Sequence, residues 1–434
     1  MPIGILAGGG RLPLMIAESA AARGIDVHIV AIRGEADPEI ERFPHTWVNW
    51  GQIGRMLTTL KREGGQQLVI AGGVRRPDFW HVRPDAGLFQ SLPAILGLIA
   101  AGGDDSVLSR VVRFFEQKGL QVRGAHEIAP DLLAEAGDLL DTKLTPQDRR
   151  DAEIGFAVRR QLARLDAGQS VVVADGCVLA IEGAEGTDRM LERVLGLPQR
   201  EETMLRQGVL AKGPKPGQEL RIDMPAIGPR TVDGVVAAGL AGIVVEAGSV
   251  LVLDREETLR RAAANACAIH GLGAAPGLIV AAPPPPSAHL IGRLRPSRRD
   301  RGDIERGMAV VARLAAFATG QAAVVARSHV LAVEGAEGTA AMLARVRGLR
   351  QWSDRRSRRR LGALVVRAQA EDDAGPALLT LLQQAALQGL AAVAIAGEGP
   401  LLEAARAGAR AADDLGLCLV TCDIGRQEQG PGSR

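Results

Sequence analysis

Tyrosine is absent from this 434-residue chain, and aromatic residues as a whole make up only 3% of it. Proteins that bind single-stranded nucleic acids commonly stack the bases on aromatic side chains, so no base-stacking platform is expected here. The net charge is also small, at +2 from 52 basic and 50 acidic residues, and offers little attraction to phosphate backbones. These two absences argue against nucleic acid as a partner.

Cysteine and long apolar runs are scarce as well. Cys177, Cys267, Cys418 and Cys422 form no CxxC pair, and the seven histidines form no HxH or HExxH pattern. This usage predicts a reduced, cytosolic protein without structural zinc. No apolar run reaches the roughly 20 residues that span a bilayer, so no transmembrane helix is expected. The first apolar run follows no basic region, so no signal peptide is expected either.

What is present is typical of packed α/β domains, because 47% of the residues are hydrophobic. At roughly 150 residues per domain, the length predicts two to four domains. Apolar runs alternate with helical patterns at the start of the chain, as in a parallel α/β sheet. The expected strands are 2–7, 27–31, 67–71 and 170–174, and the expected helices are 12–23, 53–62, 107–118 and 154–165.

The chain also repeats itself. Residues 168–197 and 320–349 align without a gap at an offset of 152, and 20 of these 30 positions are identical. This predicts a duplicated domain, because so long an ungapped match does not arise from composition alone. Between the copies, residues 283–286 are four consecutive prolines, which predict a stiff linker. Downstream, the segment KPGQELRIDMP of the first copy has no counterpart in the second.

Two glycine-rich segments follow expected strands. AGGGR contains Gly9, Gly10 and Arg11, and AGGVRR contains Gly72, Gly73 and Arg75. Glycine lets the backbone approach a phosphate, and loops after neighbouring strands of a parallel sheet converge on one crevice. An anionic ligand such as a nucleotide or a pyrophosphate is therefore favoured, with tight structural turns as the alternative.

Two further segments place acidic residues at expected helix starts. GGDDS contains Gly103, Asp104 and Asp105, and GAEGTD contains Thr187 and Asp188. Asp105, and either Thr187 or Asp188, are expected to cap their helices. The alternative for Asp104 or Asp105 is contact with a ligand hydroxyl or a metal-bound water. Asp188 is of interest because the second copy has Ala340 at the matching position.

The densest polar group follows the first copy of the repeat. It contains Lys212, Lys215, Gln218, Glu219, Arg221 and Asp223. A carboxylate among cations suits Mg²⁺-assisted phosphoryl chemistry, since Lys and Arg bind phosphate oxygens and Asp binds the metal or orients water. The alternative is a solvated charged loop.

Taken in order, AGGGRLP, AGGVRRP, GGDDSVL, GQSVVVADGCVLAIEGAEGTDRM and KPGQELRIDMPAIGP resemble the LpxI family, the UDP-2,3-diacylglucosamine pyrophosphatases of lipid A synthesis. The resemblance covers about residues 1–275. It implies an α/β protein with a Rossmann-like N-terminal domain and a distinct α/β C-terminal domain, here duplicated, with substrate held between the domains. It also implies Mg²⁺-dependent hydrolysis of UDP-2,3-diacylglucosamine to lipid X and UMP, at the cytoplasmic face of the inner membrane.

The resemblance also assigns roles to residues. Asp223, in the R-x-D-x-P motif, is implied to be catalytic and to bind Mg²⁺. The implied substrate-binding residues are Gly9, Gly10, Arg11, Gly72, Gly73, Arg75, Gly103, Asp104, Thr187, Asp188, Lys212, Gln218 and Arg221. Glu219 departs from the family, because many members have Asp there, and this puts a direct metal role for the position in doubt.

The expected domains are 1–132, 133–278 and 302–424, with a linker over 279–301 and a disordered tail over 425–434. The third domain is expected to be a degenerate copy without an active site. Two acyl chains need an apolar chamber or contact with the membrane, and Leu88 to Ile99 is a candidate lining, with a buried core helix as the alternative. A homodimer is left open.

Two other classes of function remain open. A nucleotide-cofactor oxidoreductase would use the N-terminal glycine loop, although its spacing is not GxGxxG. A non-catalytic regulatory protein would use the duplicated domain to bind a partner, and Asp223 in the first copy argues against this.

Overall fold

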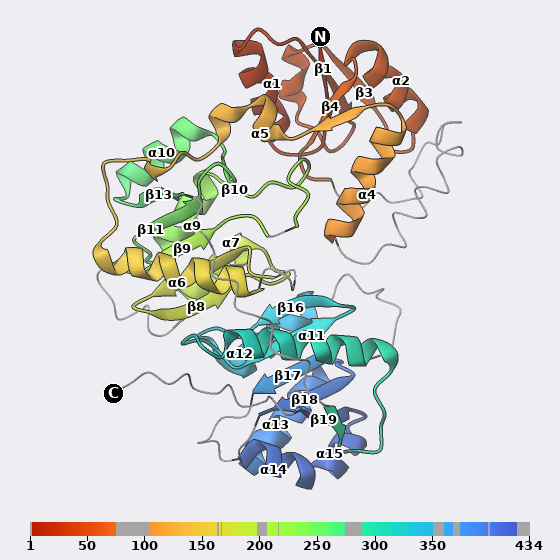
Figure 1. Ribbon diagram of the computed structural model, residues 1–434, viewed down its shortest axis with the longest axis vertical. Coiled ribbons are helices and arrows are strands. Elements are labelled where there is room, and N and C mark those ends of the chain that lie inside the picture. The colour runs from red at the N-terminus through yellow and green to blue at the C-terminus, as the bar shows by residue number, and fades with distance from the viewer. Residues whose placement is uncertain are drawn as a thin grey trace, which may run out of the picture. The chain divides into compact units, whose positions relative to one another are not determined.

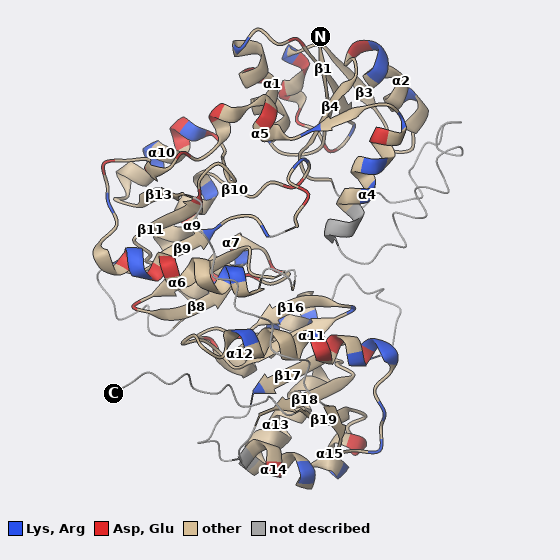
Figure 2. Ribbon diagram, in the orientation of Figure 1, with Lys and Arg blue, Asp and Glu red and all other residues tan. Residues whose placement is uncertain are grey.

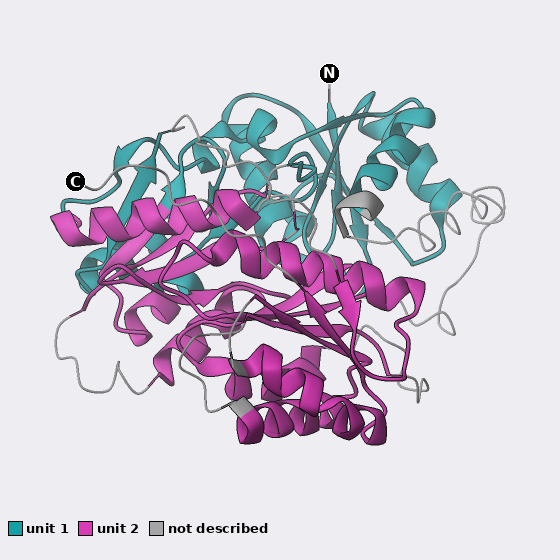
Figure 3. Cartoon of the chain, turned by 60° about the horizontal axis from the view of Figure 1, so that its bottom comes forward, with its two compact units in different colours: residues 1–142, 217–232, 245–274 teal, residues 143–216, 233–244, 275–434 magenta. Residues whose placement is uncertain are grey.

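The computed structural model describes residues 2–74, 104–162, 165, 167–197, 206–215, 217–273, 288–349, 360–367, 374–397 and 400–422. The chain forms two compact units (Figure 3). The first unit contains Met1–Thr142, Gly217–Val232 and Val245–Ala274, and the second contains Lys143–Pro216, Asp233–Val244 and Ala275–Arg434. Arg75, Gly103 and the candidate apolar lining Leu88 to Ile99 lie outside the described residues.

The N-terminal part of the first unit is a five-stranded parallel sheet with strand order β3-β2-β1-β4-β5. The strands are β1 (Ile3–Ala7), β2 (Val27–Ile32), β3 (His45–Val48), β4 (Gln67–Ala71) and β5 (Gln121–Arg123). The helices are α1 (Leu12–Ala22), η1 (Pro38–Arg42), α2 (Ile53–Glu63), α4 (Asp104–Gln117), α5 (Ala125–Ile128) and η3 (Pro130–Leu132). This arrangement confirms the predicted Rossmann-like domain.

The three central strands of this sheet, β1, β2 and β4, are largely apolar because both of their faces are buried, whereas the edge strands β3 (HTWV) and β5 (QVR) are shorter and partly exposed. Along β1, Ile5 belongs to the core cluster that includes residues of α1, and Leu6 belongs to the cluster that includes residues of α2 and α4. The alternation follows from the two-residue period of a strand. The strand order reverses between β1 and β4, and open parallel sheets bind their ligands at this point, beyond the carboxyl ends of the strands.

The rest of the first unit contains β6 (Gly137–Asp138), β10 (Ala226–Ile227), β12 (Leu251–Val252), α10 (Arg255–Ala264) and β13 (Ala268–Leu272). Strand β10 pairs in parallel with β12, and β13 pairs with β6 in antiparallel fashion. Two elements, α9 (Pro229–Ala237) and β11 (Gly242–Glu246), contain residues of both units.

The second unit contains most of the first C-terminal copy and all of the second copy. From the first copy it contains α6 (Pro146–Leu162), β7 (Ser170–Ala174), β8 (Cys177–Ile181), α7 (Thr187–Leu195) and β9 (Val209–Lys212). The second copy contains β14 (Ala288–Leu290), α11 (Arg298–Leu314), β15 (Ala322–Ala326), β16 (His329–Val333), α12 (Gly338–Leu349), β17 (Ala363–Arg367), α13 (Ala374–Leu387), β18 (Ala392–Ala396), α14 (Pro400–Ala407), α15 (Ala409–Asp414) and β19 (Cys418–Cys422). Helix α11 packs on β15 and β17 (Figure 1).

The duplication is confirmed by the topology. The strand order β6-β13-β11-β9-β7-β8 of the first copy returns as β14-β19-β18-β17-β15-β16 in the second. A bulge occurs at the same place in both hairpins, between Val172 and Val173 and between Val324 and Val325. The two copies therefore share their register as well as their sequence.

Two expected boundaries differ from the structure. Helix α6 begins at Pro146 rather than at residue 154, because Thr145 and Asp148 form a capping box. Thr145 Oγ1 accepts a hydrogen bond from the Asp148 N–H, and Asp148 Oδ2 accepts one from the Thr145 N–H, both at 3.1 Å. The second copy also begins inside the range expected to be a linker, 279–301. Strand β14 pairs there with β19, and Ser297 caps α11.

Charged residues gather on the helices and loops, whereas the strands carry few of them (Figure 2). This distribution is expected for sheets that are buried on both faces. Of the helices that the structure describes, none combines the length and the hydropathy needed to cross a bilayer.

Candidate functional site

Two glycine loops form a pocket at the carboxyl end of the N-terminal sheet. Its volume is about 430 Å³, and it is lined by Gly9, Gly10, Gly34, Glu35, Gly73 and Val74. These residues follow β1, β2 and β4, so the pocket lies where the strand order reverses. The structure thus brings three predicted residues together, and it adds Gly34 and Glu35, which the sequence analysis did not single out.

Close backbone packing explains the glycines in these loops. The Gly9 N–H donates to the Gly73 carbonyl at 2.6 Å, and the Gly73 N–H donates back at 3.0 Å. A Cβ on Gly8 would lie 2.6 Å from the Gly73 oxygen, and one on Gly72 would lie 2.6 Å from the Gly9 oxygen. Gly8 and Gly72 therefore hold the loops together, and Gly9 and Gly73 both join the loops and line the pocket.

Arg11 follows the pocket-lining Gly10 and lies beside two carboxylates. Its Nε donates to Asp254 Oδ1 at 2.9 Å, and its Nη1 lies 3.6 Å from Glu39. The Asp254 carboxylate raises the pKa of Arg11. Asp254 itself has a left-handed backbone, with φ of 43°, a conformation that is uncommon outside glycine. The orientation of Arg11 thus depends on a residue that the sequence analysis missed.

The segment around Asp223 is anchored on both sides. Ile222 packs against the core cluster that includes α2 and α4 residues, and Met224 packs against the cluster that includes α1 residues. Asp223 is exposed, and its Oδ2 accepts a 2.6 Å hydrogen bond from Gln218 Nε2. The two apolar anchors therefore hold an accessible carboxylate in place.

Arg221 is engaged by two carboxylates. Its Nε and Nη2 donate to the two oxygens of Glu219 at 2.7 Å each, and its Nη1 donates to Glu116 of α4 at 2.8 Å. The hydrogen bonds from Arg221 hold the pKa of Glu219 below its usual value, and Glu219 raises the pKa of Arg221. The positive charge of Arg221, expected to bind phosphate oxygens, is balanced by Glu219 and Glu116. The contact with Glu116 also links this segment to helix α4.

In the second unit, Lys212 and Thr187 belong to a buried polar cluster. Lys212 Nζ donates to Thr187 Oγ1 at 3.0 Å, and the same hydroxyl donates to Glu182 Oε2 at 3.0 Å and lies 3.1 Å from Ser170 Oγ. All four side chains are at most 9% exposed. Lys212 is buried and is the last residue of β9, so its interpretation as part of a solvated loop is wrong. Buried charges are costly unless they are hydrogen-bonded, and in this cluster the Thr187 hydroxyl bonds to both the ammonium and the carboxylate.

The second copy has lost half of this cluster. Ser170 lies opposite Lys212 across β7 and β9, and the equivalent pair across β15 and β17 is Ala322 and Val366. The carboxylate and the threonine remain, with Thr339 Oγ1 donating to Glu334 Oε1 at 2.7 Å. Burial raises the pKa of Glu334.

The remaining predicted residues lie at helix starts. Gly186, with φ of 82°, is the N-cap of α7, so the prediction that Thr187 or Asp188 caps this helix is wrong; Asp188 is exposed in the first turn. Helix α4 begins at Asp104, so Asp105 lies within its first turn rather than at its N-cap, and neither side chain is among those described.

Within the described part of the chain, no group of three or more His, Cys, Asp or Glu residues is placed to hold a metal ion.

Comparison with known proteins agrees with this domain organisation. The model of the LpxI N-terminal domain matches residues 2–132, and the model of the LpxI C-terminal domain matches twice, at residues 135–270 and 287–420. The UDP-2,3-diacylglucosamine pyrophosphatase LpxI of Caulobacter vibrioides is 42% identical over 276 residues, which are 63% of this chain and 98% of that relative. The chain therefore belongs to the LpxI family and carries a second copy of the family's C-terminal domain.

Proposed function

We propose that this chain hydrolyses the diphosphate of UDP-2,3-diacylglucosamine to lipid X and UMP. The proposal rests on the name of its 42% identical relative and on one structural observation. A buried ammonium, two hydroxyls and a carboxylate form a connected cluster in the first C-terminal copy, and the ammonium and one hydroxyl are replaced by apolar side chains in the second. Such a difference between two copies of one scaffold is expected where only one copy performs chemistry.

Lys212 provides the positive charge of this cluster. A cation in a buried environment interacts more strongly with developing negative charge than one in water, so it stabilises the phosphoryl oxygens as the anhydride bond breaks. Thr187 accepts from the ammonium and donates to Glu182, and this chain of hydrogen bonds fixes the position of the Lys212 side chain. Thr187 and Glu182 act as positioning residues in this proposal.

We also propose that Asp223 binds Mg²⁺. Magnesium commonly takes one or two protein carboxylates and completes its coordination with water and substrate phosphates. Asp223 fits that mode, because its carboxylate is exposed and accepts a hydrogen bond from the neutral amide of Gln218. The bound cation would neutralise diphosphate charge, and Gln218 would keep the Asp223 carboxylate oriented.

The pocket of the N-terminal sheet is proposed to hold the nucleotide end of the substrate. Its volume of about 430 Å³ lies in the range of small-molecule sites. The amides of Gly9 and Gly73 already bond across the two loops, so the proposed contribution of the glycines is room for a phosphate to approach the backbone, and Arg11 adds a cation next to the loop. Because the substrate carries two acyl chains, we further propose that the protein works at the cytoplasmic surface of the inner membrane.

The test is a hydrolysis assay with the purified full-length chain. UDP-2,3-diacylglucosamine in detergent micelles is incubated with Mg²⁺ or with a chelator, and the products are identified by mass spectrometry. We expect lipid X and UMP with Mg²⁺ and neither product with the chelator. Intact substrate after incubation with folded protein and Mg²⁺ would refute the proposed reaction, and hydrolysis that persists with the chelator would refute the metal.

A further inference from the structure

The two C-terminal copies contact each other through equivalent residues. The Ala184 N–H donates to the Leu331 carbonyl at 3.0 Å, and the Ala336 N–H donates to the Leu179 carbonyl at 2.9 Å. Both donors and both acceptors are related by the offset of 152 that relates the copies. A reciprocal exchange of this kind defines an isologous interface, in which one surface binds a second copy of itself.

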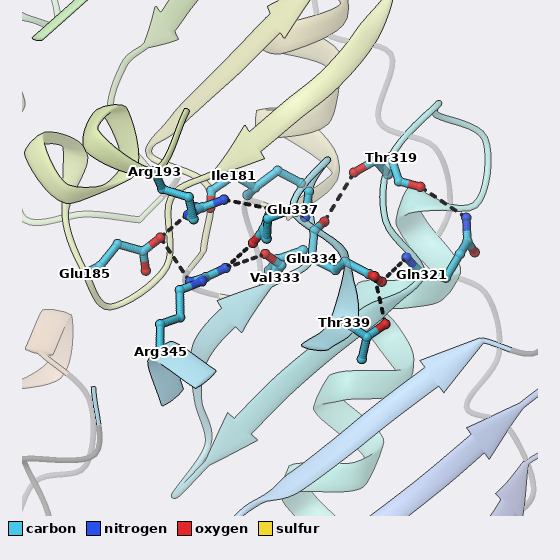
Figure 4. A network of polar contacts seen from close by, with 11 residues as sticks. Ile181, Glu185, Arg193, Thr319, Gln321, Val333, Glu334, Glu337, Thr339 and Arg345 are labelled. Carbon is cyan, nitrogen blue, oxygen red and sulfur yellow. Dashed lines mark hydrogen bonds and ion pairs between the residues drawn. The ribbon is translucent and has the colours of Figure 1, made fainter. Parts of the chain in front are cut away.

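The same symmetry relates four charged side chains (Figure 4). Arg193 donates to Glu185 at 2.8 Å and lies 3.0 Å from Glu337, and Arg345 donates to Glu337 at 2.8 Å and to Glu185 at 3.2 Å. The carboxylates are 4–5% exposed and the arginines 12–17%. Each arginine therefore bridges the acid of its own copy and the acid of the other copy, and removal of one charge would leave a buried partner unbalanced.

Glycine is required at the point of closest approach. A Cβ on Gly183 would clash with the Leu331 oxygen, and a Cβ on Gly335 would clash with the Leu179 oxygen. Residues 182–187 and 334–339 have the identical sequence EGAEGT. The longest unchanged run of the repeat therefore coincides with the contact between the copies.

The apolar cores of the copies are also continuous. One hydrophobic cluster joins Val158 and Leu162 of α6 to Met308 and Leu314 of α11, and it extends through the inner strands of both copies. Helices α6 and α11 pack on each other. The contact is thus an extended apolar interface with a buried charged edge, as expected of a stable protein–protein interface.

We propose that this surface of the first copy, formed by Leu179, Gly183, Ala184, Glu185 and Arg193 and here called the pairing face, is a homodimerisation surface that the second copy occupies from within the same chain. The second copy is then an internal replacement for the C-terminal domain of another subunit. Its own pairing face is preserved, while its Lys212 and Ser170 equivalents are apolar. If the second copy is displaced, the pairing face of one chain should bind the pairing face of another.

The test uses the full-length chain with a protease site inserted after Ala275, which is cleaved once the protein has folded. We expect the two pieces of the otherwise unchanged chain to elute together as a one-to-one complex. Gly335→Val obstructs the contact from the second copy alone and leaves the first copy unaltered. After cleavage, its N-terminal piece should separate and sediment at twice the mass of one piece. Gly335→Val combined with Gly183→Val obstructs both pairing faces, and its N-terminal piece should sediment at the mass of one piece.

Arg345→Glu is a second way to displace the second copy, for the case that Gly335→Val does not fold. It should release the same self-pairing N-terminal piece, because Glu185 and Arg193 are unchanged. An N-terminal piece that retains its circular dichroism spectrum but stays at single mass over a wide concentration range would overturn the proposal. Pieces that remain together in both variants would also overturn it, because the exchanged contacts would then not hold the copies together.

Discussion

Ser170 on β7 lies directly opposite Lys212 on β9, and both side chains contact the hydroxyl of Thr187. Opposite residues of an antiparallel pair project to the same face of the sheet, so a change at one alters the surroundings of the other. In the second copy these positions are Ala322 and Val366, with the strand register unchanged. The second copy forms the same pair of strands without these two polar groups, so neither is required for this arrangement of strands.

Thr187→Val should lower kcat/KM by about 10- to 100-fold, because Lys212 loses the hydrogen bond that holds its ammonium in position, and one hydrogen bond to a charged group is worth roughly 1.5–3 kcal/mol. The matched control is Thr339→Val, which removes the equivalent hydroxyl from the second copy. We expect that control to keep full activity and to lose about 1.5–3 kcal/mol of stability, because it removes a hydrogen bond to a buried carboxyl. Equal losses of kcat/KM in the two variants would contradict the role of the first cluster.

Asp223→Asn should reduce kcat by at least about 100-fold, because the amide keeps the shape of the side chain but is a poor magnesium ligand. Glu116→Gln is the control, because it also converts a carboxylate to an amide. Glu116 is an exposed partner of Arg221, and Arg221 keeps its hydrogen bonds to Glu219 in this variant. We expect the control to stay within about threefold of the unaltered chain, since exposed ion pairs contribute little. Measurement of kcat against Mg²⁺ concentration checks both, and near-normal activity of Asp223→Asn at saturating Mg²⁺ would exclude it from the reaction.

Gly9→Val and Gly8→Val should separate binding from folding. A Cβ on Gly9 lies 3.2 Å from the Glu35 carbonyl in the wall of the pocket, so the valine should raise KM more than it lowers Tm. A Cβ on Gly8 lies 2.6 Å from the Gly73 carbonyl, so that variant should mainly lower Tm. An unchanged KM with a large fall in Tm for Gly9→Val would show that the loop is only a structural turn.

Mild acid should stabilise the second copy through Glu334. Burial raises the pKa of this carboxyl above its ordinary value of 4.5, so the folded state keeps the proton to higher pH than the unfolded chain does. The resulting stability is fully present below the unfolded pKa and is lost as the pH rises through the folded pKa. The amides of β15 and β16 should therefore gain protection from hydrogen exchange as the pH falls from neutral toward the ordinary pKa of 4.5, relative to the amides of the Glu334→Gln variant at each pH. A difference between the two proteins that does not change with pH would contradict this.

Four strands, β1, β2, β4 and β7, were predictable because each is a mainly apolar run, whereas short polar strands such as β3 (HTWV) and β5 (QVR) were not predicted. The bounds of β4 and β7 agree with the sequence prediction at every residue. The first eight residues of α6 were missed because the polar segment PQDRRDAE has no apolar periodicity. The available signal was the Thr145-x-x-Asp148 capping box, which depends on side-chain hydrogen bonds rather than on hydrophobicity.

The glycine loops were also predictable, because their chemistry depends on local backbone freedom. The partners of the charged residues were not. Asp254 lies 243 positions from Arg11 in the sequence. Ser170 has no distinguishing feature in the sequence, and only the pairing of β7 with β9 shows that it lies opposite Lys212. A comparison of the two copies at positions that are polar in one and apolar in the other would have found Ser170. The identical segment EGAEGT lies at the contact between the copies, a role that the repeat in the sequence did not predict.

The shared apolar cluster of α6 and α11 has a consequence for how the protein responds to dilution. Both halves of that cluster belong to one polypeptide, so their association is intramolecular, with an effective concentration that short tethers place on the order of millimolar. A pair of separate subunits would dissociate at low abundance and expose this surface, whereas the tethered pair keeps it covered at any number of molecules per cell. The tethered pair of C-terminal copies contains one polar cluster of Lys212, Thr187, Glu182 and Ser170, whereas a pair of identical subunits would contain two.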